Sequence, residues 1–112
     1  MGERTAHMID NKRRFTRHRV EAPVLVRSIG SGATGASRGH CLNLSIGGAG
    51  AIVSGPWMPG QVVSMELALP AMDHPVLVDA RLCHRNRLYC GFEFLAPSDD
   101  ARKQIMMAIG EA

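Results

Sequence analysis

The chain has 112 residues, which is enough for one domain with a modest hydrophobic core and too few for two. Its net charge of +3, from 13 Lys and Arg against 10 Asp and Glu, is too mild for a protein that coats nucleic acid. Twelve glycines and an aromatic content of only 4% indicate many turns and favour short strands.

A polar, basic segment comes first, over residues 1–20. It contains five cations and no acid between positions 12 and 19, namely Lys12, Arg13, Arg14, Arg17 and Arg19. The segment has neither helical nor alternating periodicity, so we expect a flexible arm. Such an arm either meets an anion or, on charge alone, is a solvated basic tail without a specific partner. We expect the folded domain to comprise residues 21–112.

Short strands with turn signals between them fill the middle of the chain. β-Branched or alternating apolar residues predict strands over 22–29, 42–46, 51–54, 63–69, 76–84 and 88–95. A glycine-rich loop from Gly30 to Gly39 is expected to connect the first two. Strands at this spacing are typical of an antiparallel sandwich or barrel.

The second of these strands carries two polar side chains of interest. Leu42, Leu44 and Ile46 alternate with Asn43 and Ser45. Because successive side chains of a strand point to opposite faces, Asn43 and Ser45 are predicted to share the face opposite the apolar residues. That face would then be available to a ligand.

Only near the end of the chain do the apolar residues change from the spacing of a strand to that of a helix. Ser98 is a good helix N-cap, and Asp99 and Asp100 suit the positive end of a helix dipole. Four apolar residues then form one stripe at helical spacing: Ala101, Ile105, Ala108 and Ile109. One short helix is therefore expected to cap the barrel.

The cysteines predict neither disulfides nor a metal. Cys41, Cys83 and Cys90 are an odd number without C-x-x-C spacing, and we expect them to be small buried hydrophobic residues. Thiolate and imidazole suit zinc, but His40 adjoins Cys41 and His84 adjoins Cys83. Adjacent strand residues point to opposite faces, so neither pair can easily place both members on one ion.

Nucleotide-hydrolysing and membrane proteins are also disfavoured. The segment Gly30–Gly35 matches G-x-G-x-x-G, but no amphipathic helix follows it, and it lacks the Lys-Ser/Thr ending of a P-loop. No stretch approaches the roughly 18 apolar residues of a membrane span, and the N-terminus lacks a signal-peptide core. We expect a cytoplasmic protein without membrane insertion.

Two short motifs carry the strongest signal. Residues 13–17 read Arg-Arg-Phe-Thr-Arg, an R-x-x-x-R, and residues 43–48 read Asn-Leu-Ser-Ile-Gly-Gly, an N-x-S-x-x-G. Each is weak alone. Together, with the strand 76–84, the ending Tyr-Cys-Gly-Phe-Glu-Phe at 89–94 and the final helix, they resemble the PilZ family of cyclic di-GMP receptors over residues 10–110.

The resemblance implies an all-β fold, a six-stranded antiparallel barrel with a short C-terminal helix, and a binding protein that has no cofactor and is not an enzyme. Carried over residue by residue, it implies that Arg13 and Arg17 bind guanine edges and phosphates of cyclic di-GMP, and that Asn43, Ser45 and Gly48 complete the pocket. Candidates for additional ligand contacts are Lys12, Arg14 and Gly47. Motility and biofilm formation are the processes that such receptors are expected to regulate.

The residue types also fit this ligand on chemical grounds. A guanidinium can bind a phosphate bidentately, hold guanine O6 and N7, or stack on the base. The amide of Asn43 both donates and accepts, the hydroxyl of Ser45 adds one adaptable partner, and Gly48 allows close approach or a positive φ. A ligand that touches both motifs is expected to fix residues 10–20 against the barrel and so signal to an unknown effector protein.

Two alternatives stay open. The chain could be a PilZ-like adaptor that binds proteins without a ligand, or a small nucleic-acid-binding barrel that uses its basic arm on phosphates. The nucleic-acid alternative predicts strong salt dependence and tolerance of alanine at Asn43 or Ser45, whereas the receptor hypothesis predicts damage at both positions.

Overall fold

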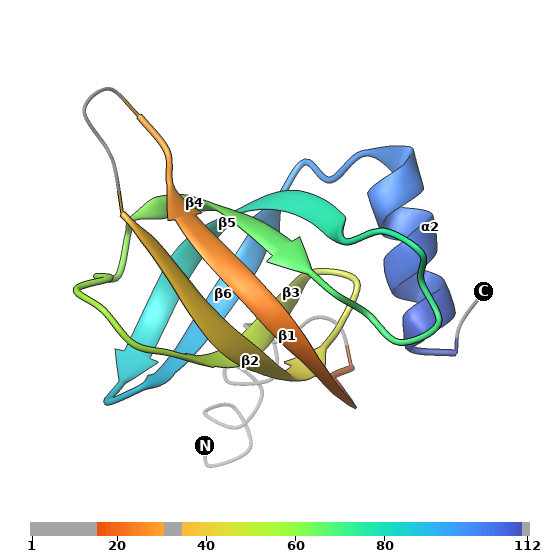
Figure 1. Ribbon diagram of the computed structural model, residues 1–112, viewed down its shortest axis with the longest axis horizontal. Helices are drawn as coiled ribbons and strands as arrows, with labels where there is room; N and C mark the ends of the chain where they lie inside the picture. Colours follow the sequence, from red (N-terminus) through yellow and green to blue (C-terminus); the bar gives the residue numbers. More distant parts are fainter. Residues whose placement is uncertain (1–15, 31–34, 111–112) are drawn as a thin grey trace, which may run out of the picture.

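A closed antiparallel β-barrel forms the body of the computed structural model, which describes residues 16–30 and 35–110 (Figure 1). Around the barrel the strands follow the order β1-β2-β3-β6-β5-β4, and β4 pairs with β1 to close it. The bounds are β1 His18–Ser28, β2 Ala36–Leu44, β3 Gly48–Val53, β4 Val62–Leu67, β5 Val76–Asn86 and β6 Tyr89–Leu95. The predicted six-stranded antiparallel barrel is therefore confirmed.

Strict alternation of side chains builds the core. In β1 every second residue from Val20 to Val26 is buried, and in β5 the same holds from Val76 to Leu82. These inward side chains pack with Leu44, Met65 and Phe92, each at most 1% exposed, in one continuous hydrophobic cluster. Burying a side chain of this size stabilises the fold by about 1.5–3 kcal/mol, so the alternation determines which face of each strand points inward.

Several strands start or end at residues other than those predicted. β1 begins at His18 instead of Ala22, so residues 18–20, assigned to the arm, belong to the barrel. β2 begins at Ala36, which shortens the expected loop of residues 30–39, because residues 36–40 pair with β1. β2 also ends at Leu44, two residues before the predicted end, and β3 begins at Gly48 instead of Ala51.

Irregularities in register alter the alternation near the predicted site. β2 has one residue, Leu42, inserted between the two that pair with consecutive residues of β3, and β1 has one extra residue between Arg19 and Ala22 relative to β2. A bulge of this kind shifts the inside–outside pattern by one position. Cys41 and Leu44, three residues apart, are therefore both fully buried. Leu42 is only half-buried, which corrects the prediction that it shares the inner face with Leu44.

The helix α2 (Asp99–Ala108) follows the last strand and packs against the barrel near β5 (Figure 1). Ser98 is its N-cap, and the Ser98 hydroxyl accepts a hydrogen bond from the Ala101 amide at 3.0 Å. Ala101 and Ile105 are buried in the core cluster. The predicted cap, acidic first turn and apolar stripe are thus confirmed. None of the helices among the described residues is long and apolar enough to cross a bilayer.

The cysteines divide between the core and the surface. Cys41 and Cys90 are buried, as expected, and each is a free thiol. Cys83 is exposed, so the prediction of a buried residue is wrong for this position. It directly follows the inward-facing Leu82, and alternation along β5 places it on the outer face beside Arg81 and Glu93.

Candidate functional site

A hollow on the outer surface of the barrel lies between the start of β1 and the end of β2. Its volume is about 430 Å³, within the range of about 300–1,000 Å³ typical of small-molecule sites. Six residues line it: Arg17, His18, Arg19, Glu21, Leu42 and Asn43. The hollow thus contains one arginine of the first motif and the asparagine of the second.

The course of β1 explains why these side chains gather. Arg19 and Glu21 occupy alternate, exposed positions of β1, so both point to the outer face, and Arg17 immediately precedes the strand. Across the sheet, Arg19 is the Cα partner of Asn43. A register irregularity lies next to this pair, between Arg19 and Ala22, and such irregularities are common beside binding sites.

Hydrogen bonds fix the orientation of the Asn43 side chain. Arg17 Nη1 donates to Asn43 Oδ1 at 2.6 Å, and Asn43 Nδ2 donates to the Tyr89 hydroxyl at 3.2 Å. Because the arginine is charged, the first bond is of the stronger class. The amide oxygen therefore faces Arg17, and the amide nitrogen faces β6.

Gly50 makes room for this arrangement. A Cβ at this position would overlap the Tyr89 hydroxyl and lie 2.8 Å from both Oδ1 and Nδ2 of Asn43. The φ of Gly50 is not positive. The requirement for glycine here is therefore one of space above the strand and not of backbone conformation.

Ser45 and Gly48 shape the turn that follows Asn43. Ser45 is only 2% exposed, and its hydroxyl accepts hydrogen bonds from the amides of Gly47 and Gly48, each at 3.1 Å. The prediction that Ser45 shares the outer face with Asn43 is wrong, because β2 ends at Leu44 and Ser45 is buried in the turn that follows. Direct contact of Ser45 with a ligand stays a prediction.

Glycine was expected at position 48 either for close approach or for a positive φ, and the structure shows which reason applies. A Cβ on Gly48 would overlap the carbonyl oxygen of Phe92 on the neighbouring strand, and its φ is not positive. Close approach of two backbones is therefore the reason for glycine, since β3 pairs with β6 at this point. Gly47 is half-buried in the same turn.

The remaining predicted contacts lie outside the part of the chain that the structure describes. These are Lys12, Arg13 and Arg14, so the structure brings together Arg17 and Asn43 but does not test the other arginine of the motif. The predicted flexible arm lies outside it as well, apart from residues 16–20.

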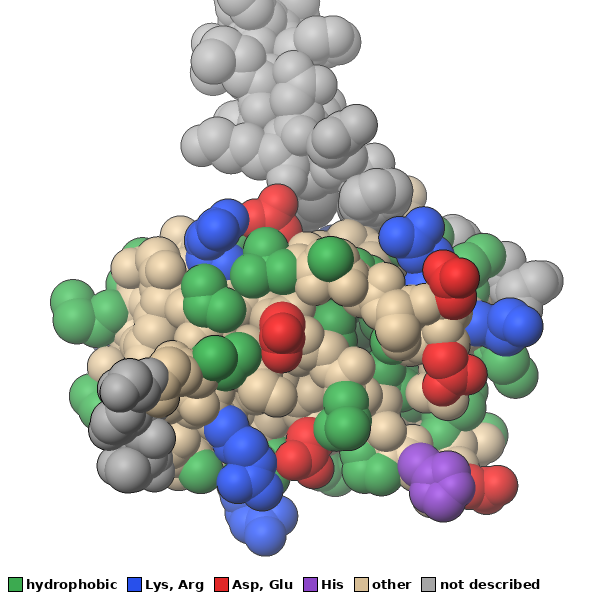
Figure 2. Space-filling model, turned by 90° about the horizontal axis from the view of Figure 1, so that it is seen from above, with side chains coloured by type: hydrophobic (Ala, Val, Ile, Leu, Met, Phe, Trp, Pro, Cys, Tyr) green, Lys and Arg blue, Asp and Glu red, His purple; other side chains and the backbone are tan. Residues whose placement is uncertain are grey.

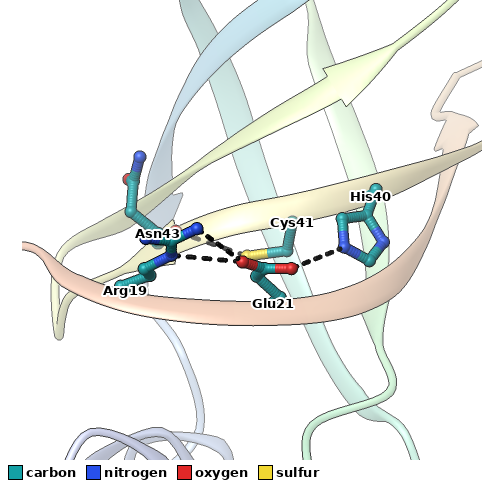
Figure 3. Close-up of polar contacts among 5 residues, drawn as sticks. All are labelled: Arg19, Glu21, His40, Cys41 and Asn43. Atoms are coloured by element: carbon teal, nitrogen blue, oxygen red, sulfur yellow. Dashed lines mark hydrogen bonds and ion pairs between the residues drawn. The ribbon is translucent and has the colours of Figure 1, made fainter.

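A carboxylate also belongs to the hollow. Arg19 contacts Glu21 Oε2 through Nε and Nη2, both at 3.1 Å, and His40 Nε2 lies 3.7 Å from Glu21 Oε1. Figure 3 shows Arg19 and His40 approaching Glu21 from its two sides, while the Asn43 side chain points away from this carboxylate.

Sequence reasoning missed Glu21 and Tyr89 as parts of the site and gave Arg19 no role of its own. Alternation with Arg17 could have placed Arg19 and Glu21 on the outer face if β1 had been extended to His18. Nothing local to Tyr89 in the sequence indicates its contact with Asn43, because the two residues are 46 positions apart.

The structure gives no support for a nucleophilic or metal-binding cysteine at the site. Burial raises the pKa of the Cys41 thiol from 9.0 to about 11, and the thiol donates to the backbone oxygen of Asn43 at 3.3 Å. A thiol that stays protonated at neutral pH is a poor nucleophile and a poor metal ligand. Among residues 16–30 and 35–110, no three His, Cys, Asp or Glu side chains are grouped so that they could hold a metal ion.

Charges on one face of the molecule are mixed. Figure 2 shows acidic, basic and apolar side chains interspersed over the face that is seen from above in Figure 1, without a single basic area. On that face the mixture does not resemble the continuous basic patch by which proteins coat nucleic acid.

The fold and the hollow define a small closed antiparallel barrel with a surface hollow that is lined by two arginines, one glutamate and the Asn43 amide. This chain belongs to the PilZ domain family, because the PilZ domain model matches residues 11–110.

Solved structures with similar folds agree with this assignment. The PilZ domain of CeSA from a cellulose-synthesizing bacterium superimposes with a TM-score of 0.67 at 18% identity, covering 85% of this chain and 96% of that one. The PilZ domain of YcgR from Escherichia coli with c-di-GMP gives 0.66 at 21% identity, covering 88% and 89%. MotI/DgrA, an inhibitor of motility from Bacillus subtilis, gives 0.71 at 14% identity and 88% coverage, and this chain spans 49% of its length. No curated protein matches this chain in sequence at a significant level.

Proposed function

We propose that this protein is a receptor that binds cyclic di-GMP in the hollow beside β1 and β2 and has no catalytic activity. The observation that carries the proposal is the contact between Arg17 and Asn43, which joins the two sequence motifs in one surface hollow. Family membership supports it, as does the presence of c-di-GMP in structures of YcgR.

The chemistry of the hollow suits this ligand. Cyclic di-GMP has two phosphate charges and two guanines. Arg17 offers a guanidinium, which can pair with phosphate or with the O6 and N7 edge of guanine. Asn43 offers an amide whose orientation is already fixed by Arg17 and Tyr89, so little side-chain entropy remains to be lost on binding.

The other motif residues receive distinct roles in the proposal. Arg13 approaches the ligand from the arm and shares phosphate and guanine contacts with Arg17. Ser45 and Gly48 hold the turn after Asn43, and Ser45 can still touch the ligand if the turn adjusts. Further contacts are proposed for Lys12, Arg14 and Gly47.

Signalling through the arm is the second part of the proposal. A ligand that joins Arg13 to the hollow fixes residues 10–16, whereas Arg17 already contacts Asn43 and β1 already begins at His18. The newly fixed segment changes the surface presented to an effector protein. Hydrogen exchange tests this directly: amides of residues 10–16 should gain protection at saturating cyclic di-GMP, and unchanged exchange there would refute the signalling step. Since a nucleotide second messenger acts inside the cell, we also propose a cytoplasmic location in a bacterium.

Calorimetric titration with cyclic di-GMP tests the binding step, with GMP and cyclic di-AMP as ligand controls. Arg13→Ala and Arg17→Ala should each weaken binding by about 1.5–3 kcal/mol, roughly ten- to a hundredfold. Arg27→Ala is the matched control, because Arg27 is an exposed arginine of β1 that pairs with Glu66 and does not line the hollow.

The outcome separates the receptor from the two alternatives. A ligand-free adaptor gives no binding heat with cyclic di-GMP at high micromolar concentration. A nucleic-acid-binding barrel binds oligonucleotides with steep salt dependence and tolerates Asn43→Ala. The receptor binds one defined nucleotide and loses it when Arg17 or Asn43 is replaced.

A further inference from the structure

A negatively charged side chain lines a hollow that is otherwise suited to an anion. Glu21 lines the same hollow as Arg17 and Asn43. Its carboxylate repels a phosphate and also occupies the guanidinium of Arg19, through Nε and Nη2 at 3.1 Å. Glu21 therefore opposes, in two ways, the ligand for which the hollow is otherwise built.

The pair of Arg19 and Glu21 can be separated at little cost. The side chain of Arg19 is 86% exposed and that of Glu21 is 51% exposed. Exposed ion pairs of this kind contribute little to stability, because water solvates both partners well when they part. A phosphate that arrives in the hollow can thus replace the carboxylate as the acceptor for Arg19.

Arg19 is also placed to reach such a phosphate. It lies two residues after Arg17, which also lines the hollow, and it is the Cα partner of Asn43 across the sheet. A ligand held by Arg17 and Asn43 therefore lies beside the Arg19 side chain, which also lines the hollow.

We propose that Arg19 is a further ligand-binding residue and that Glu21 lowers the affinity of the site by holding Arg19 and repelling phosphate. On binding, Arg19 exchanges the carboxylate of Glu21 for a phosphodiester oxygen of the nucleotide. This inference rests on the proposed function, since the ligand is taken to be cyclic di-GMP.

If Arg19 exchanges partners in this way, replacing Glu21 and replacing Arg19 should change the affinity for cyclic di-GMP in opposite directions. Glu21→Gln removes the competing charge and keeps the size of the side chain, so it should bind cyclic di-GMP about three- to tenfold more tightly at low salt. Arg19→Gln should bind about three- to tenfold more weakly, the effect of losing one partly exposed charged contact. In the double variant the gain from Glu21→Gln should shrink, because part of that gain acts through Arg19.

A matched control is available on β4, which pairs with β1. Glu66 pairs with Arg27 at 3.3 Å on the outer surface away from the hollow. Glu66→Gln removes the same charge from the protein and should change the affinity by less than about twofold, since the distance to the hollow lets solvent and salt screen it. All the replaced side chains are partly or largely exposed, so the barrel tolerates these changes.

Calorimetric titration of the wild type and these four variants with cyclic di-GMP tests the inference. Tighter binding by Glu21→Gln alone, with weaker binding by Arg19→Gln, supports it. The inference is overturned if Glu21→Gln binds like the wild type, if Glu66→Gln gives the same gain, or if Arg19→Gln binds as well as the wild type. The proposed function itself fails if the wild type does not bind the nucleotide at high micromolar concentration, whereas the inference alone fails if the wild type binds and the variants give any of these three results.

Discussion

Replacing Gly50 by alanine should separate Asn43 from Tyr89 while leaving the barrel intact. The added Cβ would overlap the Tyr89 hydroxyl and lie 2.8 Å from both polar atoms of the Asn43 amide. These atoms are the ends of side chains, which can move. The backbone φ of Gly50 is not positive, so alanine introduces no backbone strain.

The size of the effect follows from the two hydrogen bonds that share Asn43. A neutral bond such as that from Asn43 Nδ2 to Tyr89 contributes about 0.5–1.5 kcal/mol, and a charged one such as that from Arg17 contributes about 1.5–3 kcal/mol. Gly50→Ala removes the first and displaces the second. We therefore expect an affinity for cyclic di-GMP about tenfold lower, equal to about 1.4 kcal/mol, and an unfolding free energy about 1 kcal/mol lower.

Calorimetric titration measures the affinity, and urea denaturation measures the free energy of unfolding. Tyr89→Phe is the informative companion, because it removes only the hydroxyl and should weaken binding about two- to tenfold. Gly35→Ala is the control: its Cβ would contact side chains of Ser28 and Trp57 instead of the hollow, and affinity should stay within about twofold of the wild type.

The reasoning is refuted if Gly50→Ala binds cyclic di-GMP as tightly as the wild type. In that case the orientation of the Asn43 amide does not matter to the ligand. Equal losses of affinity in Gly50→Ala and Gly35→Ala would also refute it, since the effect would then not depend on Asn43.

Three further predictions concern the turn after β2 and the thiol beneath it. Gly48→Ala should lower the unfolding free energy by about 1–3 kcal/mol in urea denaturation, because its Cβ meets the backbone carbonyl of Phe92, which cannot move alone; a neutral substitution would contradict the close approach. Ser45→Ala should cost about 1–3 kcal/mol, since two amides lose their acceptor, and unchanged stability would show that water replaces it. Burial raises the pKa of Cys41 from 9.0 to about 11, so the unfolded chain loses this proton first and stability should fall as pH rises between these values. Cys41→Ala should show a shallower fall over the same range, and an equal slope would contradict the shift.

Much of the fold can be predicted from patterns within short stretches of the sequence. The alternation from Val76 to Leu82 predicts both the presence of β5 and its inner face, and Ser98 with two following aspartates predicts the start of α2. Such features depend on residues that are close in sequence, so a period or a cap is sufficient to predict them.

The bulge at Leu42 could not be predicted in the same way. Its position depends on the register that β2 takes against β3, and no residue within 42–46 encodes that register. The simple alternation therefore placed Leu42 inside and Ser45 outside, whereas the structure leaves Leu42 half-buried and buries Ser45 in the turn.

The sequence predicted those residues of the site that belong to the two motifs. Asn43 and Arg17 were both named from the sequence, and the structure brings them into contact. Tyr89 and Glu21 were not. The contact of Tyr89 with Asn43 arises from strand pairing, and Glu21 lines the hollow from the outer face of a strand that begins earlier than its β-branched run suggests.

Chemical-shift mapping of the ¹⁵N-labelled protein during titration with cyclic di-GMP tests most directly whether the hollow is the binding site. Saturable shifts should be largest at Arg17, Arg19, Leu42 and Asn43, and small at Ser64 and Glu66 on β4. The absence of saturable shifts, or a set of largest shifts on the outer face of β4, would contradict the assignment of the ligand to the hollow.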